Sequence, residues 1–346
     1  MHNQSMDALV WLGPRQMELR REPVPMPKAG EVLVEVASVG ICGSELSGYL
    51  GQNSLRRPPL IMGHEAAGRI AFDCDAALSD GSPARAGTRV TFNPLLTCGV
   101  CDLCRAGKSN LCRNRQLISA HRPGAFATYV AVPARLCFPL PEHLSLTMGS
   151  LTEPLACGVR AVAHADAPQH LVILGAGPIG LLCLVAARAA GIEQILVSDV
   201  SERRLAVARA WGAMATVNAR DNVLAAVQAF APGGADAAID AVGLAVTRDQ
   251  AVRAVIPGGR VVFIGLHEEE SMVPANYIVR QEISIIGSFT YSDADFARAL
   301  DLLAAGRVPL DGEWLEERPL AAGPVAFEEL LAGATRAAKI VLRVGE

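Results

Sequence analysis

Short apolar segments separated by glycines and prolines occupy the first part of the chain. Residues 31–36 form a valine-rich run between two glycines, and similar runs cover residues 70–72, 89–92 and 126–132. Runs of this length and composition are typical of β-strands. Residues 13–30 hold four of the 21 prolines, which favours extended chain over helix there. This part of the chain is therefore predicted to be rich in β-structure.

A different pattern, in which apolar strand-like runs alternate with helical stretches, begins near residue 150. The run 171–174 precedes a helical stretch at 181–190, and the run 195–199 precedes another at 202–211. Further strand candidates follow at 235–240, 260–265 and 283–287. Strands that are apolar on both faces and alternate with helices indicate a parallel sheet covered on both sides. After about Ser288 the alternation is lost, and residues 338–344 again resemble a strand.

Length and composition narrow the class of protein. At roughly 150 residues per domain, 346 residues correspond to about two domains. Hydrophobic residues make up 51% and charged residues 19%, which argues against extended disorder. No apolar run reaches the roughly 18 residues that span a bilayer, and residues 1–5 lack the layout of a signal peptide. With a formal charge of −4 and no strongly basic segment, neither nucleic acid nor a membrane is an expected partner.

Four of the nine cysteines, Cys98, Cys101, Cys104 and Cys112, lie within fifteen residues. Because no export signal accompanies them, a metal site in a reducing cytoplasm is favoured over disulfides. Four thiolates complete the tetrahedral shell of Zn²⁺ and leave no position for water, which is typical of a structural site. Two alternatives stay open, namely unligated buried thiols and a zinc ribbon that binds nucleic acid. The segment has no aromatic platform for the latter.

A second possible metal site is dispersed along the chain. Cys42, His64 and Glu65 together offer ligand types that Zn²⁺ accepts, and Glu153 adds another carboxylate. Each of these residues taken alone is more often structural than a ligand. A catalytic zinc uses three protein ligands and keeps the fourth position for water or substrate. Since neighbours on a regular strand point in opposite directions, His64 and Glu65 can share a site only if the chain bends, and Gly63 favours a bend.

The segment Gly175-Ala-Gly177-Pro178-Ile179-Gly180 matches the pattern of a dinucleotide-binding turn. It directly follows the run 171–174 and opens a helical stretch. The alternative is a tight turn whose glycines only allow the helix to pack on the strand. Asp199 ends the next strand candidate, where an acidic side chain accepts hydrogen bonds from the adenosine ribose hydroxyls. The carboxylate favours NAD over NADP, whereas Arg203 or Arg204 could instead bind a 2′-phosphate.

These motifs, in this order, resemble the zinc-dependent medium-chain dehydrogenase/reductase family, and within it the polyol (sorbitol-like) dehydrogenases. The resemblance runs through essentially the whole chain, with its clearest segments at 40–44, 62–65, 98–112, 124–127, 153–155, 175–180 and 339–342. It implies an α/β fold class, with a GroES-like β-rich catalytic domain plus a doubly wound parallel-sheet Rossmann domain. The catalytic domain would comprise residues 1–150 and 289–346, including an extension at 1–5 and a structural-zinc lobe at 93–115. Residues 151–288 would form the Rossmann NAD-binding domain.

The resemblance also implies roles for individual residues. Cys42, His64 and Glu65 would be ligands of a catalytic zinc, and Glu153 would bind it directly or through water. Ser44 would pass on the substrate proton, so that Ser44, Glu65 and Glu153 are the implied catalytic residues. The residues implied to contact the cofactor are Gly175, Gly177, Pro178, Ile179, Gly180, Asp199, Arg204, Leu266, Phe289 and Tyr291. The four clustered cysteines would hold a structural zinc, which makes two Zn²⁺ per chain besides NAD.

Three positions depart from the family pattern. Glu45 stands where many relatives have Asp, so the carboxylate that would orient His64 is one methylene longer. Ser47 stands where relatives frequently have the His that ends the proton relay. Thr290 stands where sorbitol-like enzymes carry Arg, which argues against sorbitol itself as the substrate.

The predicted function is zinc-dependent oxidation of a secondary alcohol or polyol to a ketone, with hydride transfer to NAD. One alternative within the family is an amino alcohol, as in its threonine branch. Another is a sugar phosphate, for which Arg56 and Arg57 are the cations near Ser47. A non-enzymic alternative is an NAD-binding sensor on the same fold. The family resemblance further implies a homodimer or homotetramer.

Overall fold

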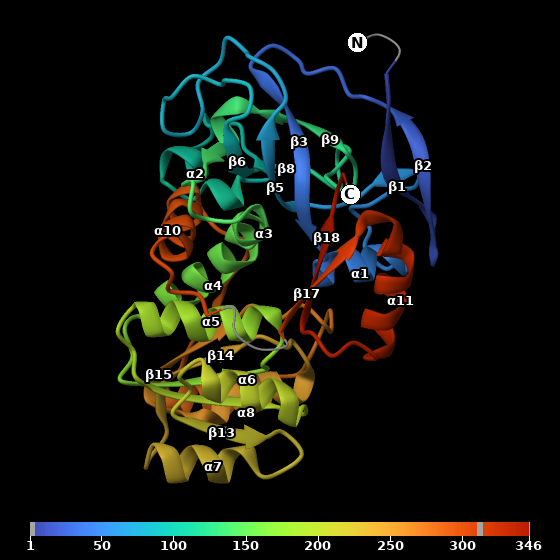
Figure 1. Cartoon of the computed structure of the whole chain (residues 1–346). Helices are drawn as coiled ribbons and strands as arrows, with labels where there is room; N and C mark the ends of the chain where they lie inside the picture. The colour runs from blue at the N-terminus through green and yellow to red at the C-terminus, as the bar shows by residue number, and fades with distance from the viewer. Residues whose placement is uncertain (1–3, 310–313, 346) are drawn as a thin grey trace. The chain divides into compact units, whose positions relative to one another are not determined.

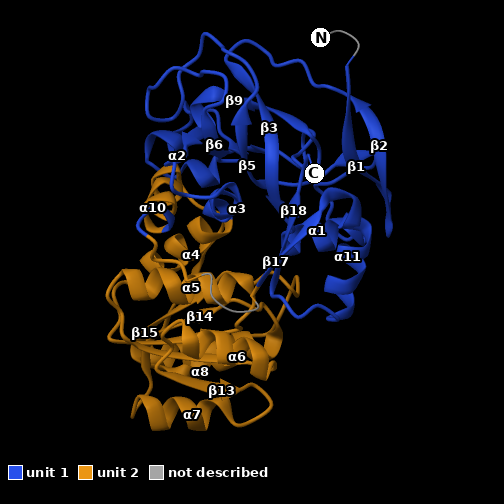
Figure 2. Ribbon diagram, in the orientation of Figure 1, with its two compact units in different colours: residues 1–153, 303–305, 315–346 blue, residues 154–302, 306–314 orange. Residues whose placement is uncertain are grey.

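The computed structural model describes residues 4–309 and 314–345, which divide into two compact units (Figure 2). Unit 1 comprises residues 1–153, 303–305 and 315–346, and unit 2 comprises residues 154–302 and 306–314. The predicted extension at residues 1–5 lies largely outside the described residues, and Ser5 already belongs to the first strand. Among the described residues, no helix combines the length and apolar character needed to cross a membrane.

Unit 1 is built mainly from antiparallel strands. A small sheet has the order β2-β1-β4, and a larger one has the order β10-β6-β5-β3-β18-β17, with β9 also paired to β3. The strands are β1 (Ser5–Gly13), β2 (Gln16–Pro23), β3 (Glu31–Gly40), β4 (Leu60–Ile61), β5 (Glu65–Ile70), β6 (Arg89–Phe92), β7 (Leu95–Leu96), β8 (Gln116–Leu117), β9 (Tyr129–Pro133), β10 (Cys137–Pro139), β17 (Leu315–Pro319) and β18 (Lys339–Arg343). The helices are α1 (Gly43–Tyr49), α2 (Asp102–Arg105), α3 (Leu146–Ser150) and α11 (Gly323–Ala332), with 3₁₀ turns at Ser109–Leu111, Ala134–Leu136 and Leu320–Ala322.

The end of the chain returns to unit 1 because its apolar residues complete the core there. β18 pairs antiparallel with β3, so that the red and blue strands run side by side in Figure 1. From α11, Phe327 is fully buried and packs its ring against Tyr49 and Phe126, with ring centroids 5.1 and 5.9 Å apart. Burying aromatic rings in this way contributes a large share of core stability.

Unit 2 is a parallel α/β sheet with strand order β13-β12-β11-β14-β15-β16. Its strands are β11 (His170–Leu174), β12 (Gln194–Asp199), β13 (Ala215–Asn218), β14 (Ala235–Asp240), β15 (Val255–Phe263) and β16 (Ser284–Gly287). Its helices are α4 (Thr152–Ala165), which begins at the unit boundary, α5 (Pro178–Ala189), α6 (Glu202–Ala210), α7 (Val223–Phe230), α8 (Ala245–Ala254), α9 (Ala275–Gln281) and α10 (Asp293–Ala304). Residues Leu171 to Leu174 are at most 1% exposed, so both faces of the central strand are covered. The order corresponds to 3-2-1-4-5-6, which is that of a Rossmann fold, and confirms the predicted fold class.

Several boundaries differ from those expected. The sequence pattern predicts a strand at residues 70–72, but β5 lies at Glu65–Ile70, because its small residues are held by pairing to β3 rather than by their own β-propensity. Unit 2 extends to Leu302, past the expected end at residue 288. In this extension Asp295 of α10 forms a 3.0 Å ion pair with Arg160 of α4.

The turn between β11 and α5 needs its last glycine for a steric reason. A Cβ at Gly180 would lie 1.8 Å from the carbonyl oxygen of Gly175, whereas a Cβ at Gly177 would meet nothing within 4 Å. Gly180 therefore allows the first turn of α5 to approach the end of β11.

We expect Gly180→Ala to lower the free energy of unfolding by about 2 kcal/mol, because the added methyl must displace backbone. Chemical denaturation measures this, with Gly177→Ala as the matched control that leaves unfolding nearly unchanged. Equal stability of the two variants would contradict the steric argument.

Candidate active site

Three of the predicted zinc ligands meet in unit 1. Ligand atoms of Cys42, His64 and Glu65 all lie within 4.8 Å of one another. Cys42 is the N-cap of α1, and Glu65 is the first residue of β5. His64 and Glu65 are buried, whereas Cys42 is partly exposed. One sulfur, one imidazole and one carboxylate at this spacing fit Zn²⁺ with a position left open.

The bend expected at Gly63 is present. Gly63 has φ +96°, and a Cβ there would lie 2.6 Å from the amide nitrogen of Phe126. Only glycine adopts this conformation at no steric cost in so confined a place. The bend separates β4 from β5 and turns the adjacent side chains of His64 and Glu65 towards one site.

The carboxylate of Glu45 holds these segments together. It is fully buried, and its Oε1 accepts the amide of Gly63 at 2.7 Å and lies 2.8 Å from His64 Nδ1. Its Oε2 accepts the amide of Cys42 at 3.2 Å. A proton on Nδ1 is thereby directed at Glu45, which leaves Nε2 of His64 as the ligand atom. The longer carboxylate at this position still reaches the ring.

The charges of Glu45 and His64 depend on each other, because the carboxylate and the ring are in contact. Burial by itself raises the pKa of the Glu45 carboxyl, but His64, Arg56 and the Cys42 amide hold that pKa below its usual value. Burial by itself lowers the pKa of His64, whereas Glu45 and Cys42 raise that pKa well above its usual value. A negative carboxylate beside the ring is the arrangement that orients a metal-binding imidazole.

A lysine from the end of the chain faces the other side of the site. Lys339 of β18 is buried, forms an ion pair with the Glu65 carboxylate, and donates to the carbonyl of Ile41 at 3.0 Å. Burial lowers the pKa of Lys339, but Glu65, Cys42 and Glu153 raise it above its usual value. The lysine therefore balances the negative charge of the predicted ligands.

Glu153 occupies a different position from Glu65. It lies in the first turn of α4 and is 6% exposed, but it does not belong to the set of three ligand atoms within 4.8 Å. Its charge still acts on Lys339, which places it in the surroundings of the site.

Ser44 is held by an arginine that sequence reasoning considered only as a phosphate partner. The Ser44 hydroxyl donates to Cys42 Sγ at 3.4 Å, and Arg56 Nη2 lies 3.3 Å from Ser44 Oγ. The Arg56 guanidinium also contacts Ser119, whose hydroxyl lies 3.1 Å from His64 Nδ1. Ser47 donates its hydroxyl to the Ser44 carbonyl at 3.0 Å.

The four-cysteine cluster in unit 1 has the composition and spacing of a second metal site. Its sulfur pairs Cys98–Cys112, Cys98–Cys104 and Cys101–Cys112 are 3.5, 4.0 and 4.0 Å apart, and all four cysteines are free of disulfides. Sulfurs about 2.3 Å from a central Zn²⁺ would be separated by about 3.8 Å in a tetrahedron, so the cluster fits a structural zinc. Backbone hydrogen bonds from Val100 and Cys101 lower the pKa of Cys98 to about 6, which favours the thiolate that binds metal.

In unit 2 the glycine turn lies at the N-terminus of α5. Gly175 has φ +97°, Gly177 is the N-cap, and Pro178 is the first helical residue. Open space over Gly177 lets a phosphate approach the free backbone N–H groups of the helix. Asp199 ends β12 and accepts the amides of Ala176 at 2.7 Å and Ser201 at 2.8 Å. Each carboxylate oxygen keeps a further lone pair for a hydroxyl.

The remaining predicted cofactor residues differ in exposure. Arg204 is 44% exposed at its side chain and lies 3.9 Å from Asp199 Oδ2. Leu266 and Phe289 are 80% and 38% exposed. The ring of Tyr291 is 1% exposed and packs against Phe296, with ring centroids 5.6 Å apart. Thr290 has φ +50°, a strained value for a β-branched residue.

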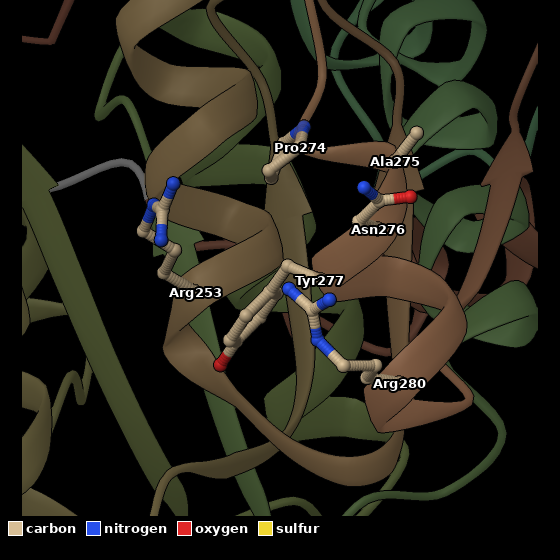
Figure 3. A pocket seen from close by; sticks show the side chains of 6 residues that line it. All are labelled: Arg253, Pro274, Ala275, Asn276, Tyr277 and Arg280. Atoms are coloured by element: carbon tan, nitrogen blue, oxygen red, sulfur yellow. The ribbon is translucent and has the colours of Figure 1, made fainter.

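A separate hollow of about 470 Å³ on unit 2 contains none of the predicted site residues (Figure 3). It is lined by Arg253, Pro274, Ala275, Asn276, Tyr277 and Arg280. Arg253 is paired with Asp249 at 2.9 Å and lies 5.4 Å from the centre of the Tyr277 ring. Its charge is therefore already satisfied within the protein.

Comparison with known proteins places the chain in a family. The model of the alcohol dehydrogenase GroES-like domain matches residues 28–142, and the zinc-binding dehydrogenase model matches residues 178–305. Sorbitol dehydrogenase of Bacillus subtilis (strain 168) is 33% identical over 316 residues, which cover 88% of each chain. The chain belongs to the zinc-dependent medium-chain dehydrogenases. Its similarity to the polyol branch confirms the family that the motifs indicated.

Two solved structures resemble this dehydrogenase along almost its whole length. The short chain alcohol dehydrogenase rspB of Escherichia coli CFT073, in complex with NADH, is 27% identical with a TM-score of 0.89. A protein of Sinorhizobium meliloti 1021 solved as a zinc-binding dehydrogenase, bound to NADP, is 31% identical with a TM-score of 0.87. Each alignment covers 99% of this chain and 100% of the other.

Three residues of the dehydrogenase site make contacts that the sequence did not predict. Lys339 carries a visible signal, since it is a charged residue at the start of the apolar run Ile340 to Leu342. Arg56 and Ser119 carry no such signal, because their contacts join segments 63 residues apart. Only tertiary structure shows that they reach Ser44 and His64.

For the structural zinc, we expect Cys98→Ser to remove about one zinc ion per chain and to lower the Tm, because the tetrahedral shell loses a thiolate. Metal analysis and thermal denaturation measure both effects. Cys74→Ser is the control, since Cys74 lies outside both clusters. Unchanged zinc content in the Cys98 variant would rule the cluster out as a metal site.

For the other site, we expect Glu65→Gln to lower zinc content by about one ion per chain and Glu153→Gln to retain it. Because Glu65→Gln also leaves the buried Lys339 unpaired, the double variant Glu65→Gln/Lys339→Met controls for the lost ion pair. The opposite result, zinc lost only in Glu153→Gln, would make Glu153 the third ligand.

Proposed function

We propose that this dehydrogenase oxidises a secondary hydroxyl of a polyol to a ketone and transfers the hydride to NAD⁺. The observation that carries the proposal is the convergence of Cys42, His64 and Glu65 within 4.8 Å, with the Ser44 hydroxyl beside the cysteine sulfur. Membership in a family whose relatives include a sorbitol dehydrogenase supports the substrate class.

The donor set fits zinc, and Cys42, His64 and Glu65 would hold it. Zinc bound there would act as a Lewis acid that lowers the pKa of the substrate hydroxyl. Glu45 keeps the His64 ring in the ligating tautomer, and Lys339 compensates the carboxylate charge. Both groups are buried and hydrogen-bonded, so they hold the site without rearrangement during the reaction.

Ser44 would accept the proton of the substrate hydroxyl. Its Oγ adjoins the sulfur of a proposed ligand, and a serine hydroxyl both accepts and donates hydrogen bonds. Ser47 does not extend the relay as a histidine would, because its hydroxyl donates to the Ser44 carbonyl. Water is therefore the proposed acceptor of the proton that leaves Ser44.

The cofactor would bind with its pyrophosphate at the N-terminus of α5 and its adenosine ribose at Asp199. NAD⁺ takes the hydride when bound. The buried carboxylate of Asp199 supports NAD over NADP because it would repel a 2′-phosphate. Arg204 beside it is the group that would favour NADP, and one similar structure holds NADP.

The sugar-phosphate alternative loses one of its two supports. Arg56 is 4% exposed and its guanidinium is occupied by Ser44 and Ser119. Arg57 is exposed and remains the other candidate. An amino alcohol has no specific observation in its favour, and a sensor without turnover has no physical need for an open metal site beside a serine hydroxyl.

We propose a cytoplasmic location, as predicted from the sequence. We also propose that the chain is a homo-oligomer. β16 ends the sheet of unit 2 among the described strands, and its Ile285 is 36% exposed. An edge strand with an exposed apolar side chain is typical of a surface that is covered. Sedimentation velocity would measure the mass, and a monomer would refute the proposal.

The central test is initial rates of reduced-cofactor formation with polyols, simple secondary alcohols, threonine and sugar phosphates, each with NAD⁺ and NADP⁺. We expect the highest rate with a polyol and NAD⁺. Ser44→Ala should lower kcat by about 10²-fold, because a positioned proton acceptor is lost, whereas Ser47→Ala serves as the milder control. A zinc-replete protein with no activity on any alcohol would refute the enzyme assignment.

A further inference from the structure

Arg56 is a buried cation that neither the sequence pattern nor the proposed ligand set explains. It is 4% exposed, although Ser54, Leu55 and Arg57 around it are exposed. Transferring a guanidinium out of water is costly unless its N–H groups are satisfied. A buried cation at this position therefore indicates a function that an apolar side chain of similar size would not perform.

The guanidinium makes four hydrogen bonds, all to two serines. Nη1 donates to the Ser44 carbonyl at 3.0 Å and Nη2 to Ser44 Oγ at 3.3 Å. Nε donates to the Ser119 carbonyl at 3.1 Å, and Nη2 also contacts Ser119 Oγ at 3.4 Å. Because the fork is planar and rigid, it fixes backbone and hydroxyl of both residues at once.

We propose that Arg56 is a positioning residue of the oxidation, which fixes the Ser44 hydroxyl as the proton acceptor and supports His64 through Ser119. This inference rests on the proposed function, since it concerns the proton that the alcohol loses. Arg56 acts through Ser44 and Ser119.

For Ser44, the contact restricts a hydroxyl that would otherwise rotate freely. Arg56 occupies one lone pair of Oγ, and the hydroxyl hydrogen is directed towards Cys42 Sγ at 3.4 Å. The other lone pair remains to accept the substrate proton. As Ser44 takes that proton, its own hydrogen turns from Cys42 Sγ to a water molecule and is released to it, so the serine is unchanged after each turnover. The adjacent positive charge favours this release, because it stabilises the electron pair that stays on Oγ.

For His64, the support passes through a strained residue. Ser119 is fully buried with φ +82°, a conformation that non-glycine residues hold only when their surroundings impose it. Its carbonyl accepts Arg56 Nε, its amide donates to the carbonyl of Arg122 at 2.9 Å, and its hydroxyl lies 3.1 Å from His64 Nδ1. Arg56 thus helps to hold the Ser119 hydroxyl against the His64 ring, which Glu45 orients.

The helix that carries Ser44 leaves room for the arginine. A Cβ at Gly48 of α1 would lie 2.6 Å from Arg56 Cδ. Glycine at this position lets the stem of the side chain pass against the helix. Gly48→Ala therefore displaces Arg56 while keeping its charge, which provides a second and independent variant.

The test compares Arg56→Met, Arg56→Lys and Gly48→Ala with wild type, and uses Arg69→Met, at an exposed arginine of β5 without a role in the site, as the matched control. We measure kcat and KM for the alcohol that wild type oxidises best, zinc per chain, and the solvent deuterium isotope effect on kcat. Arg56→Met is expected to lower kcat by about 10- to 100-fold with KM changed less than about two-fold, because the contact acts on proton transfer. Its solvent isotope effect should increase, and its zinc content should match wild type.

Arg56→Lys is expected to recover part of the lost kcat, since it keeps the charge without the fork. Gly48→Ala should lower kcat in the same direction, and Arg69→Met should behave as wild type. If Arg56→Met does not fold, Gly48→Ala decides the question by the same readouts.

The inference is wrong if folded, zinc-loaded Arg56→Met has the kcat and isotope effect of wild type. If Arg56→Met does not fold, the same result in Gly48→Ala overturns the inference. In both cases the proposed function stays intact. Loss of zinc in proportion to kcat would also overturn the positioning of Ser44, because the contact through Ser119 to His64 would then account for the whole effect. Inactivity of wild type on every alcohol would instead overturn the proposed function, and this inference with it.

Discussion

The buried carboxylate of Glu45 is the interaction on which the candidate active site depends. It joins the amide of Cys42, the amide of Gly63 and the ring of His64. Glu45 has no exposed surface, and a buried carboxylate without hydrogen-bond donors would lower the free energy of unfolding. These donors are therefore required for the fold as well as for the site. The N-terminus of α1 and the bend before β5 are thereby held together, and both carry proposed ligands.

A second constraint is charge balance. The site brings together Cys42, Glu65 and Glu153, and the nearby cations are Lys339 and Arg56. Lys339 reaches Glu65 because the end of the chain pairs with β3, next to Gly40. The return of the C-terminal segment to unit 1 therefore completes the core and the electrostatics of the site together. The two cations act on different residues of the site. Lys339 pairs with Glu65, a proposed ligand, and Arg56 contacts Ser44, which would move the proton.

Unit 2 shows how a general fold is adapted to one ligand class. Its glycine turn depends on backbone geometry, as the close approach of Gly180 to Gly175 illustrates. Specificity for the cofactor would lie in a few side chains, of which Asp199 is held by two backbone amides. The same amides fix the carboxylate that would distinguish the two nicotinamide cofactors.

Local patterns in the sequence were sufficient for the parallel sheet, the glycine turn and the cysteine cluster, because each depends on residues close together along the chain. The bend between His64 and Glu65 also followed from a local argument at Gly63. The tertiary structure decided what depends on distant pairing: β5 at Glu65–Ile70, the extent of unit 2, the burial of Tyr291, and the contacts of Arg56, Ser119 and Lys339. These residues have no distinctive spacing, since a hydrogen bond between segments far apart depends on the path of the whole chain and not on periodicity.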